Sequence, residues 1–210
     1  MILVLDTATR TPVVALASAD GTVMAERHWQ SRHRHGEELL GKLDEALAEI
    51  GTSRGDLTAV VVGTGPGSFT GLRIGMATAK TIAYALGIPI VGVSSTRALA
   101  LAAAAADSGL REFAVSLPAG AADRYVHHFR ITDGLPAEID GPQLVATPPT
   151  IDEIDGEGVA GLAAALARLG AASLAAGETD DPATLVPAYV ALPRGLAAVT
   201  AEMTWSPDLR

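Results

Sequence analysis

The chain contains no cysteine, so disulfide bonds, thiolate zinc sites and cysteine nucleophiles are excluded. Basic residues are also scarce, because 15 Lys and Arg stand against 24 Asp and Glu and give a formal charge of −9. A protein that binds a nucleic-acid backbone by itself normally carries a basic patch. The charge therefore argues against autonomous nucleic-acid binding.

Long hydrophobic runs are missing as well. The most apolar stretch, Leu99 to Ala106, is far too short to span a bilayer. The first residues lack the positive charge of a secretory signal peptide and reach a carboxylate at Asp6. These features predict a cytoplasmic protein that does not associate with a membrane.

The chain does contain enough apolar material for a folded core. Of its 210 residues, 49% are hydrophobic and 19% are charged, which are ordinary values for a globular protein. The length predicts one large domain or two small ones.

The first half of the chain alternates between strand and helix patterns. Three short apolar runs separated by turn residues predict an antiparallel meander, and helices then alternate with buried strands. This order predicts an α/β fold in which parallel crossover strands extend a mixed sheet. The predicted strands are residues 2–5, 12–18, 22–29, 57–62 and 90–93, and the predicted helices are 36–50, 72–86 and 94–106.

The second half is less regular. Its composition predicts strands at 113–117, 125–131 and 142–146, an Ala/Leu helix at 159–169, and a loop-rich tail. The carboxylate cluster of Asp152, Glu153, Asp155 and Glu157 is interpreted as a solvated helix start and turn.

A glycine-rich loop at residues 63–71, GTGPGSFTG, lies between a predicted strand and a predicted helix. Backbone N–H groups of such a loop can hold an anion. It is not a Walker A loop, because no Gly-Lys-Ser/Thr follows, and it does not match a dinucleotide-binding fingerprint. As generic chemistry, a structural turn is favoured over phosphate binding.

Small residues recur at every fourth position in the helix after this loop, at Gly71, Gly75, Ala79 and Ala83. Such a stripe lets another element approach closely. It either packs on the chain's own sheet or forms a subunit contact, and the spacing alone does not choose between these interpretations.

Several motifs together resemble the TsaB (YeaZ) family. The central one is VGTGPGSFTGLRIGMATAK at 62–80, followed by IPIVGVSS at 88–95. The opening LVLDTAT at 3–9 fits the same family, as do HGEELL at 35–40 and the closing PAYV at 187–190. The resemblance is strong over residues 1 to about 105 and weak beyond them.

This resemblance implies an actin-like fold of two ribonuclease-H-like lobes, the second one reduced. We expect the lobes at 1–106 and 107–210. It also implies a non-catalytic scaffold in the synthesis of threonylcarbamoyladenosine in tRNA. The expected partners are a TsaD-like catalytic subunit and a TsaE-like ATPase, with a homodimer when the chain is alone and tRNA contacted only through the complex.

Partner and homodimer contacts are predicted on the helical face that carries the small-residue stripe. Gly75→Arg or Ala79→Glu is then expected to abolish pairing without unfolding the chain. The predicted interface residues are Leu39, Leu43, Leu72, Gly75, Met76, Ala79 and Ala83.

The catalytic paralogue of this family has an Asn-His-x-x-x-His metal site, whose two ligand positions correspond here to Ser95 and Leu99. Serine is a poor ligand for a transition metal and leucine is none. The five histidines are interpreted as solvated or helix-entry residues, and His127 and His128 point to opposite faces of a strand. No metal site and no catalytic residue are predicted.

Nucleotide binding is left open by the sequence. Asp6, Thr7 and Thr9 resemble the first phosphate loop of actin-like kinases, with Ala8 in place of its glycine, and a role for Asp6 in capping the loop or bonding a neighbouring strand is slightly favoured. Residues 156–160 faintly resemble an adenosine loop. We therefore expect no cofactor in the isolated chain, although a composite nucleotide site at a partner interface stays open. The hypothetical phosphate-loop remnant comprises Asp6, Thr7, Thr9, Gly65, Gly67 and Ser68.

The alternative hypothesis is a small actin-like enzyme, either an ATP-dependent phosphotransferase or a metallopeptidase-like hydrolase. A stand-alone tRNA-binding protein conflicts with the charge. The one locally basic stretch, Arg32 to His35, is the local candidate for a direct RNA contact.

Overall fold

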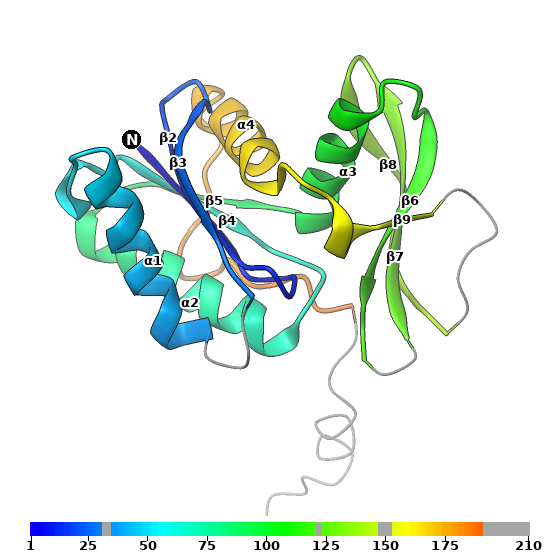
Figure 1. The fold of residues 1–210 in the computed structure, drawn as a ribbon, viewed down its shortest axis with the longest axis horizontal. Coiled ribbons are helices and arrows are strands. Elements are labelled where there is room, and N and C mark those ends of the chain that lie inside the picture. Colours follow the sequence, from blue (N-terminus) through cyan, green and yellow to red (C-terminus); the bar gives the residue numbers. More distant parts are fainter. Residues whose placement is uncertain (31–34, 121–122, 147–152, 191–210) are drawn as a thin grey trace, which may run out of the picture.

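Two β-sheets with helices packed between and around them make up the computed structural model, which describes residues 1–30, 35–120, 123–146 and 153–190 (Figure 1). The first sheet has five strands in the order β3-β2-β1-β4-β5. Strands β1 to β3 form the predicted antiparallel meander, and β4 and β5 extend it in parallel. Its strands are β1 (Ile2–Asp6), β2 (Val13–Ala17), β3 (Val23–His28), β4 (Ala59–Gly63) and β5 (Ile90–Val93).

Helices α1 (His35–Glu49) and α2 (Phe69–Leu86) cover one face of this sheet. The apolar residues Leu39, Leu43 and Leu47 of α1 are buried there, whereas Leu40 is 43% exposed. Helix α2 begins three residues earlier than predicted, because the Ser68 side chain accepts a hydrogen bond from the backbone N–H of Gly71 and caps it. It ends at Gly87, whose φ of 63° is the left-handed conformation that glycine adopts without strain.

The second sheet has four strands in the order β8-β7-β6-β9, with helix α3 (Ser95–Ala106) packed on it. Strand β8 spans eleven residues, whereas the sequence predicted only its end, because most of its residues are exposed and give no apolar pattern. Strand β9 and the short 3-10 turn η2 (Gly156–Gly158) replace the predicted helix start in the carboxylate cluster. The strands are β6 (Glu112–Pro118), β7 (Arg124–Thr132), β8 (Leu135–Val145) and β9 (Glu153–Asp155).

Helix α4 (Leu162–Ala175) comes from the second half of the chain but packs on the free face of the first sheet (Figure 1). Gly170 permits this approach, because a Cβ there would overlap the side chain of Val61 in β4. Helix α3 shows the reverse arrangement. It belongs to the first half of the chain and ends at Ala106, but it packs on the second sheet. A boundary at 106 therefore separates the two sheets but not the helices that cover them.

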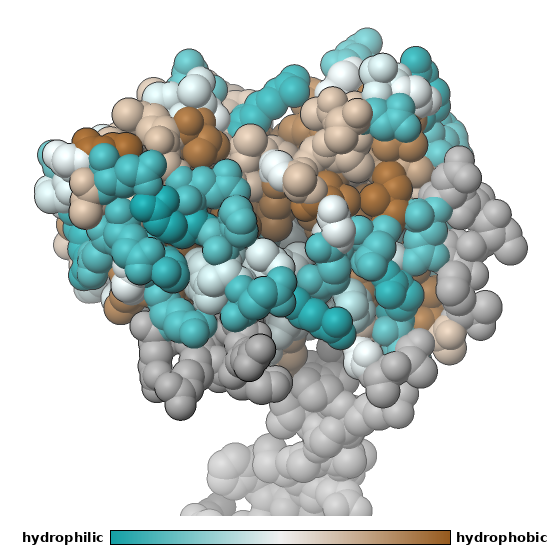
Figure 2. All heavy atoms as spheres, in the orientation of Figure 1, coloured by the Kyte–Doolittle hydropathy of each residue, from teal (hydrophilic) through white to brown (hydrophobic). Residues whose placement is uncertain are grey.

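Helices α3 and α4 also contact each other, so one apolar cluster continues from the first lobe into the second. Figure 2 shows hydrophobic surface gathered over α3 and toward α4, whereas the surface over α1 is mostly hydrophilic. Within the described part of the chain, no helix is both long and apolar enough to cross a membrane.

Candidate functional site at the junction of the lobes

The loops that follow β1 and β4 meet at a buried carboxylate. Asp6, the last residue of β1, accepts a hydrogen bond from the Ser95 hydroxyl through Oδ2 (2.6 Å) and one from the Ala8 backbone N–H through Oδ1 (2.8 Å). Ser95 Oγ in turn accepts from the backbone N–H of Gly65 (3.0 Å). Asp6 therefore ties together the β1 loop, the glycine-rich loop and the start of α3.

Burial raises the pKa of Asp6 to about 6, against the hydrogen bonds from Ser95 and Ala8, which lower it. A Cβ at Gly63 would overlap the Asp6 carboxylate, so the neighbouring strand end requires glycine. The structure thus gives Asp6 the loop-capping and bonding role that the sequence slightly favoured.

The two loops are also bonded directly to each other. The backbone N–H of Ser68 donates to the carbonyl of Ala8 (2.8 Å), and Gly67 packs so closely on Ala8 that a Cβ there would overlap it. The Thr7 hydroxyl donates to the carbonyl of Gly71 (2.7 Å). The residues of the hypothetical phosphate-loop remnant therefore lie in two loops that contact each other, and Asp6, Thr7 and Ser68 are hydrogen-bonded to other residues of this junction.

The small-residue stripe of α2 packs against its own chain. A Cβ at Gly75 would overlap the Thr7 hydroxyl, and Ala79 and Ala83 are buried against the first sheet. The interpretation in which the stripe packs on its own sheet is the one that the structure shows.

The residues of the predicted interface are buried inside the first lobe of the single chain. The exposed side chains of α2 are the ones on its outer face. The buried residues are Leu39, Leu43, Leu72, Gly75, Met76, Ala79 and Ala83.

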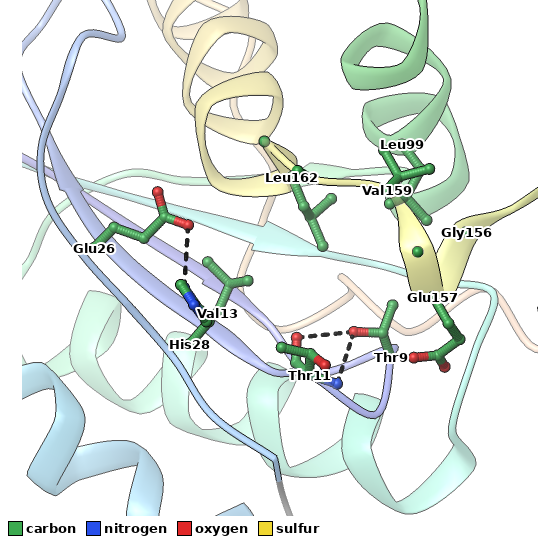
Figure 3. Close-up of a pocket in the computed structure, with 13 residues that line it drawn as sticks. Thr9, Thr11, Val13, Glu26, His28, Leu99, Gly156, Glu157, Val159 and Leu162 are labelled. Atoms are coloured by element: carbon green, nitrogen blue, oxygen red, sulfur yellow. Dashed lines mark hydrogen bonds and ion pairs between the residues drawn. The ribbon is translucent and has the colours of Figure 1, made fainter. Parts of the chain in front are cut away.

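A cavity of about 290 Å³ lies between the two lobes (Figure 3). The first lobe contributes the turn between β1 and β2, with Thr9 and Thr11, and the paired side chains of Glu26 and His28 in β3. The second lobe contributes the opposite wall, which is formed by η2 and the residues that follow it. This wall contains the segment 156–160 that resembles an adenosine loop. Sequence analysis had singled out Thr9 and the segment 156–160 separately, and the structure brings them together in the lining of this cavity.

Glu157 is the polar group that closes this cavity on the side of the β1–β2 turn. Both of its carboxylate oxygens accept from the backbone N–H of Arg10, at 3.1 and 3.0 Å. Burial raises the pKa of Glu157, although the bond to Arg10 opposes that effect. The sequence predicted a solvated carboxylate, and the structure shows Glu157 half-buried and bonded to a turn 147 residues away.

Ser95 and Leu99, which the resemblance aligned with metal-ligand positions of the catalytic paralogue, make structural contacts in this chain. The Ser95 hydroxyl is used by Asp6 and Gly65, and Leu99 is buried in the apolar core beside the cavity. Among the residues that the structure describes, no three His, Asp or Glu side chains cluster so as to hold a metal ion.

His127 differs from its predicted solvated role. It is 1% exposed, and its Nδ1 lies 2.8 Å from the hydroxyl of Thr96 in α3. Burial lowers the pKa of this imidazole, although Glu138 lies 3.5 Å from its Nε2 and raises it. The apolar neighbours of His127 along β7 could have indicated this burial from the sequence.

The segment after α4 runs back along the edge of the first sheet. The backbone N–H of Ala188 donates to the carbonyl of Thr64 in the glycine-rich loop (2.8 Å). Tyr189 packs on Phe69, and its hydroxyl accepts from the side chain of Arg73 (3.2 Å). The closing motif at 187–190 therefore supports the loop and the start of α2.

The fold and the lobe junction define an α/β protein built on two mixed sheets. The arrangement matches the structure of YeaZ from Pseudomonas aeruginosa with a TM-score of 0.77 and 22% identity, over 90% of this chain and 98% of that one. The predicted fold class is confirmed.

A family model described as TsaD, tRNA N6-adenosine threonylcarbamoyltransferase, matches residues 22–134. The Escherichia coli tRNA threonylcarbamoyladenosine biosynthesis protein TsaB is 41% identical over 99 residues, and its Bacillus subtilis counterpart is 40% identical over the same length. The chain belongs to this family, on its TsaB (YeaZ) branch, as the sequence predicted.

Sequence similarity is confined to part of each relative. The match to TsaB of E. coli covers 47% of this chain and 42% of that protein. An uncharacterized Mycobacterium leprae protein, 38% identical over 156 residues, is matched over 72% of this chain and 40% of its own length. The chain thus spans less than half the length of these curated relatives.

Proposed function

We propose that this chain is a non-catalytic subunit in the biosynthesis of threonylcarbamoyladenosine in tRNA, where it pairs with a TsaD-like catalytic subunit. The observation that carries the proposal is the similarity to proteins named TsaB, together with the family-model match at residues 22–134, which includes the glycine-rich loop and the helix that follows it. A TsaE-like ATPase is the third member of the proposed complex, and the chain pairs with itself when alone.

The lobe junction supports a non-catalytic role. The Ser95 hydroxyl holds Asp6, and Leu99 offers no ligand atom, so neither position serves a metal as in the paralogue. The loops that resemble phosphate loops bond each other. In this proposal chemistry takes place on the partner and this chain holds no cofactor of its own, while a composite nucleotide site at the partner interface stays open.

The outer face of α2 supplies the proposed docking surface. Its exposed residues recur with helical spacing, and the most exposed of them, Tyr84, shows 86% of its surface. Aromatic side chains are enriched in the cores of protein interfaces. The buried stripe beneath positions this face, which consists of Arg73, Ala77, Thr81 and Tyr84.

Contact with tRNA is assigned to the assembled complex. A net charge of −9 disfavours binding of RNA by this chain alone. The basic stretch Arg32 to His35 stays the local candidate for a direct contact, but the side chains of this stretch lie outside the described residues.

The test is pairing with the TsaD-like protein of the same organism, measured by size-exclusion chromatography with light scattering. Wild type is expected to form a heterodimer, and Ala77→Arg and Tyr84→Glu are expected to weaken it at least tenfold. Leu135→Glu, an exposed site on β8, is the matched control and is expected to pair like wild type.

Wild type that does not pair would contradict the proposed function. Normal pairing by both α2 variants would contradict only the docking surface. Calorimetry distinguishes the proposed non-catalytic subunit from the alternative, a small actin-like enzyme. Micromolar binding of Mg-ATP or zinc by the isolated chain would favour the enzyme.

A further inference from the structure

A second cavity, of about 360 Å³, lies between α3 and α4, two helices that Figure 1 shows close to each other. The chain that follows α3 and the turn between β7 and β8 complete its walls. This α3–α4 cavity shares no lining residue with the cavity between the lobes. Because α4 covers the face of the first sheet opposite to α1 and α2, the α3–α4 cavity is also separate from the proposed docking surface on α2.

The walls of the α3–α4 cavity are mainly apolar. Leu101 of α3 is buried, and Leu110 and Ile131 are partly buried and pack against the same apolar cluster. Ala104 and Ala105 add only methyl groups, so they leave the space between the larger side chains open. Apolar walls with a few polar groups are typical of cavities that bind small molecules.

The charged side chains in this lining are both arginines. The whole chain has 24 Asp and Glu against 15 Lys and Arg, yet the lining contains Arg111 and Arg168 and no acidic residue. Two positive charges beside apolar walls favour a ligand that has both an anionic group and an apolar part.

Arg111 is held in place by one of its terminal nitrogens. Its Nη1 donates to the backbone carbonyls of Ser108 (2.7 Å) and Leu110 (3.0 Å). Within the described part of the chain, its Nε and Nη2 make no hydrogen bond or ion pair. These two N–H groups form the edge with which an arginine binds both oxygens of a carboxylate.

Arg168, in the middle of α4, is exposed and makes no hydrogen bond or ion pair with any residue that the structure describes. Its positive charge is therefore not neutralised within the described chain. Substitution of Arg168 removes a charge from the cavity without breaking an internal polar contact, which makes this residue the better one to test.

We propose that the α3–α4 cavity binds a small carboxylate that carries an aliphatic chain. Arg111 and Arg168 bind the carboxylate, and the aliphatic chain packs on the apolar walls. The remaining polar side chain of the lining is that of Ser108, so an anion with two oxygen atoms fits better than a phosphate or a sulfate. The site needs no partner subunit, so it stands or falls independently of the proposed function.

Calorimetry of the isolated chain with octanoate tests the proposal. Octanoate is expected to bind at least about tenfold more tightly than octanamide, which has the same chain without the charge. The same margin is expected over acetate, which has the charge without the chain. Absence of measurable octanoate binding would overturn the proposal. Equal affinity for octanamide or for acetate would overturn it too, because the arginines or the apolar walls would then contribute nothing.

Arg168→Gln is expected to weaken octanoate binding at least about fivefold and to leave octanamide binding unchanged. Arg130→Gln is the matched control, because it removes the same charge from an exposed arginine that pairs with Glu112 and does not line the cavity. An equal loss of octanoate affinity in Arg130→Gln would show a general charge effect and contradict the proposal.

A third variant tests the position of the site. Ala105 is exposed and lines the cavity, so the indole of Ala105→Trp fills the space without entering the core, and octanoate binding should be lost. Ala106→Trp, at the next exposed residue and outside the lining, should bind octanoate like wild type. Circular dichroism checks that both variants are folded. Unchanged octanoate binding by folded Ala105→Trp would place the site elsewhere and overturn the proposal.

Discussion

The two sheets of this protein are stabilised in different ways. In the first sheet every residue of β1, β2 and β4 is buried, because α1 and α2 cover one face and α4 covers the other. In the second sheet α3 covers one face, and the edge strand β8 is largely exposed. The ion pair between Arg130 and Glu112 lies on this exposed side.

The deeper burial of the first sheet explains why the loops that meet at Asp6 are held firmly in place. The Asp6 carboxylate and the glycine-rich loop sit at the ends of strands that are packed on both sides, so their positions are set by the apolar core. Beside the shared apolar cluster, the second lobe adds polar contacts from Arg124, Asp155 and Glu157. Substitutions in the first lobe should therefore cost more than those in the second.

The largest effect is expected for Gly75→Arg. A Cβ at this position already overlaps the Thr7 hydroxyl, and a charged side chain has no room under α2. We expect a loss of at least about 4 kcal/mol in the free energy of unfolding, in the range of a buried, unpaired charge. Urea denaturation followed by circular dichroism measures it.

This prediction corrects the expectation that Gly75→Arg and Ala79→Glu abolish pairing without unfolding, because both sites are buried. Ala77→Arg is the matched control, two residues further along α2 and exposed. It is expected to change the stability by less than about 0.5 kcal/mol. Equal stability of the two arginine variants would refute the packing of α2 described above.

A smaller loss is expected for Leu166→Ala in α4. Leu166 is fully buried although it belongs to the second half of the chain, and truncation of such a side chain costs about 2–5 kcal/mol. Leu144→Ala in β8, where the leucine is 43% exposed, should cost less than about 1 kcal/mol. Similar losses for the two leucines would break the contrast between the sheets.

The same contrast decides how much of the fold the sequence predicted. Strands β1, β2 and β4 are buried on both faces and give continuous apolar runs, and all five strands of the first sheet, including the partly exposed β3, were located within a few residues. Strand β8 has exposed residues along most of its length, and only residues 142–146 were predicted. The return of α4 to the first sheet is a tertiary contact through Gly170, which no local pattern indicates.

Individual parts of the site could be predicted, but not how they come together. Asp6 and the glycine-rich loop were identified from short sequence motifs, and a hydrogen-bonding role was favoured for Asp6. It did not find that Glu157 bonds Arg10, since the two residues are 147 positions apart and a surface carboxylate is the ordinary expectation. Partners of that kind depend on how the lobes meet, and only the folded chain shows it.

The pH dependence of stability tests the first-lobe junction with the smallest expected effect. The pKa of Asp6 is about 6 in the folded chain against 3.8 for an ordinary aspartate, so the folded state binds more protons between these values. Stability therefore falls as the pH rises from about 4 to 6. At about 1.4 kcal/mol per pKa unit, the loss attributable to Asp6 is about 3 kcal/mol. Asp6→Asn carries no charge at any pH, so its unfolding free energy relative to wild type should increase by that amount between pH 4 and 7. Other groups titrate in both proteins and cancel in this difference.

Glu112→Gln, in an exposed ion pair of the second sheet, is the control and should stay within about 1 kcal/mol of wild type over the same pH range. If the difference in unfolding free energy between Asp6→Asn and wild type stays constant from pH 4 to 7, the Asp6 carboxyl is hydrated. The loops around Asp6 would then be as accessible to water as the edge strand of the second sheet.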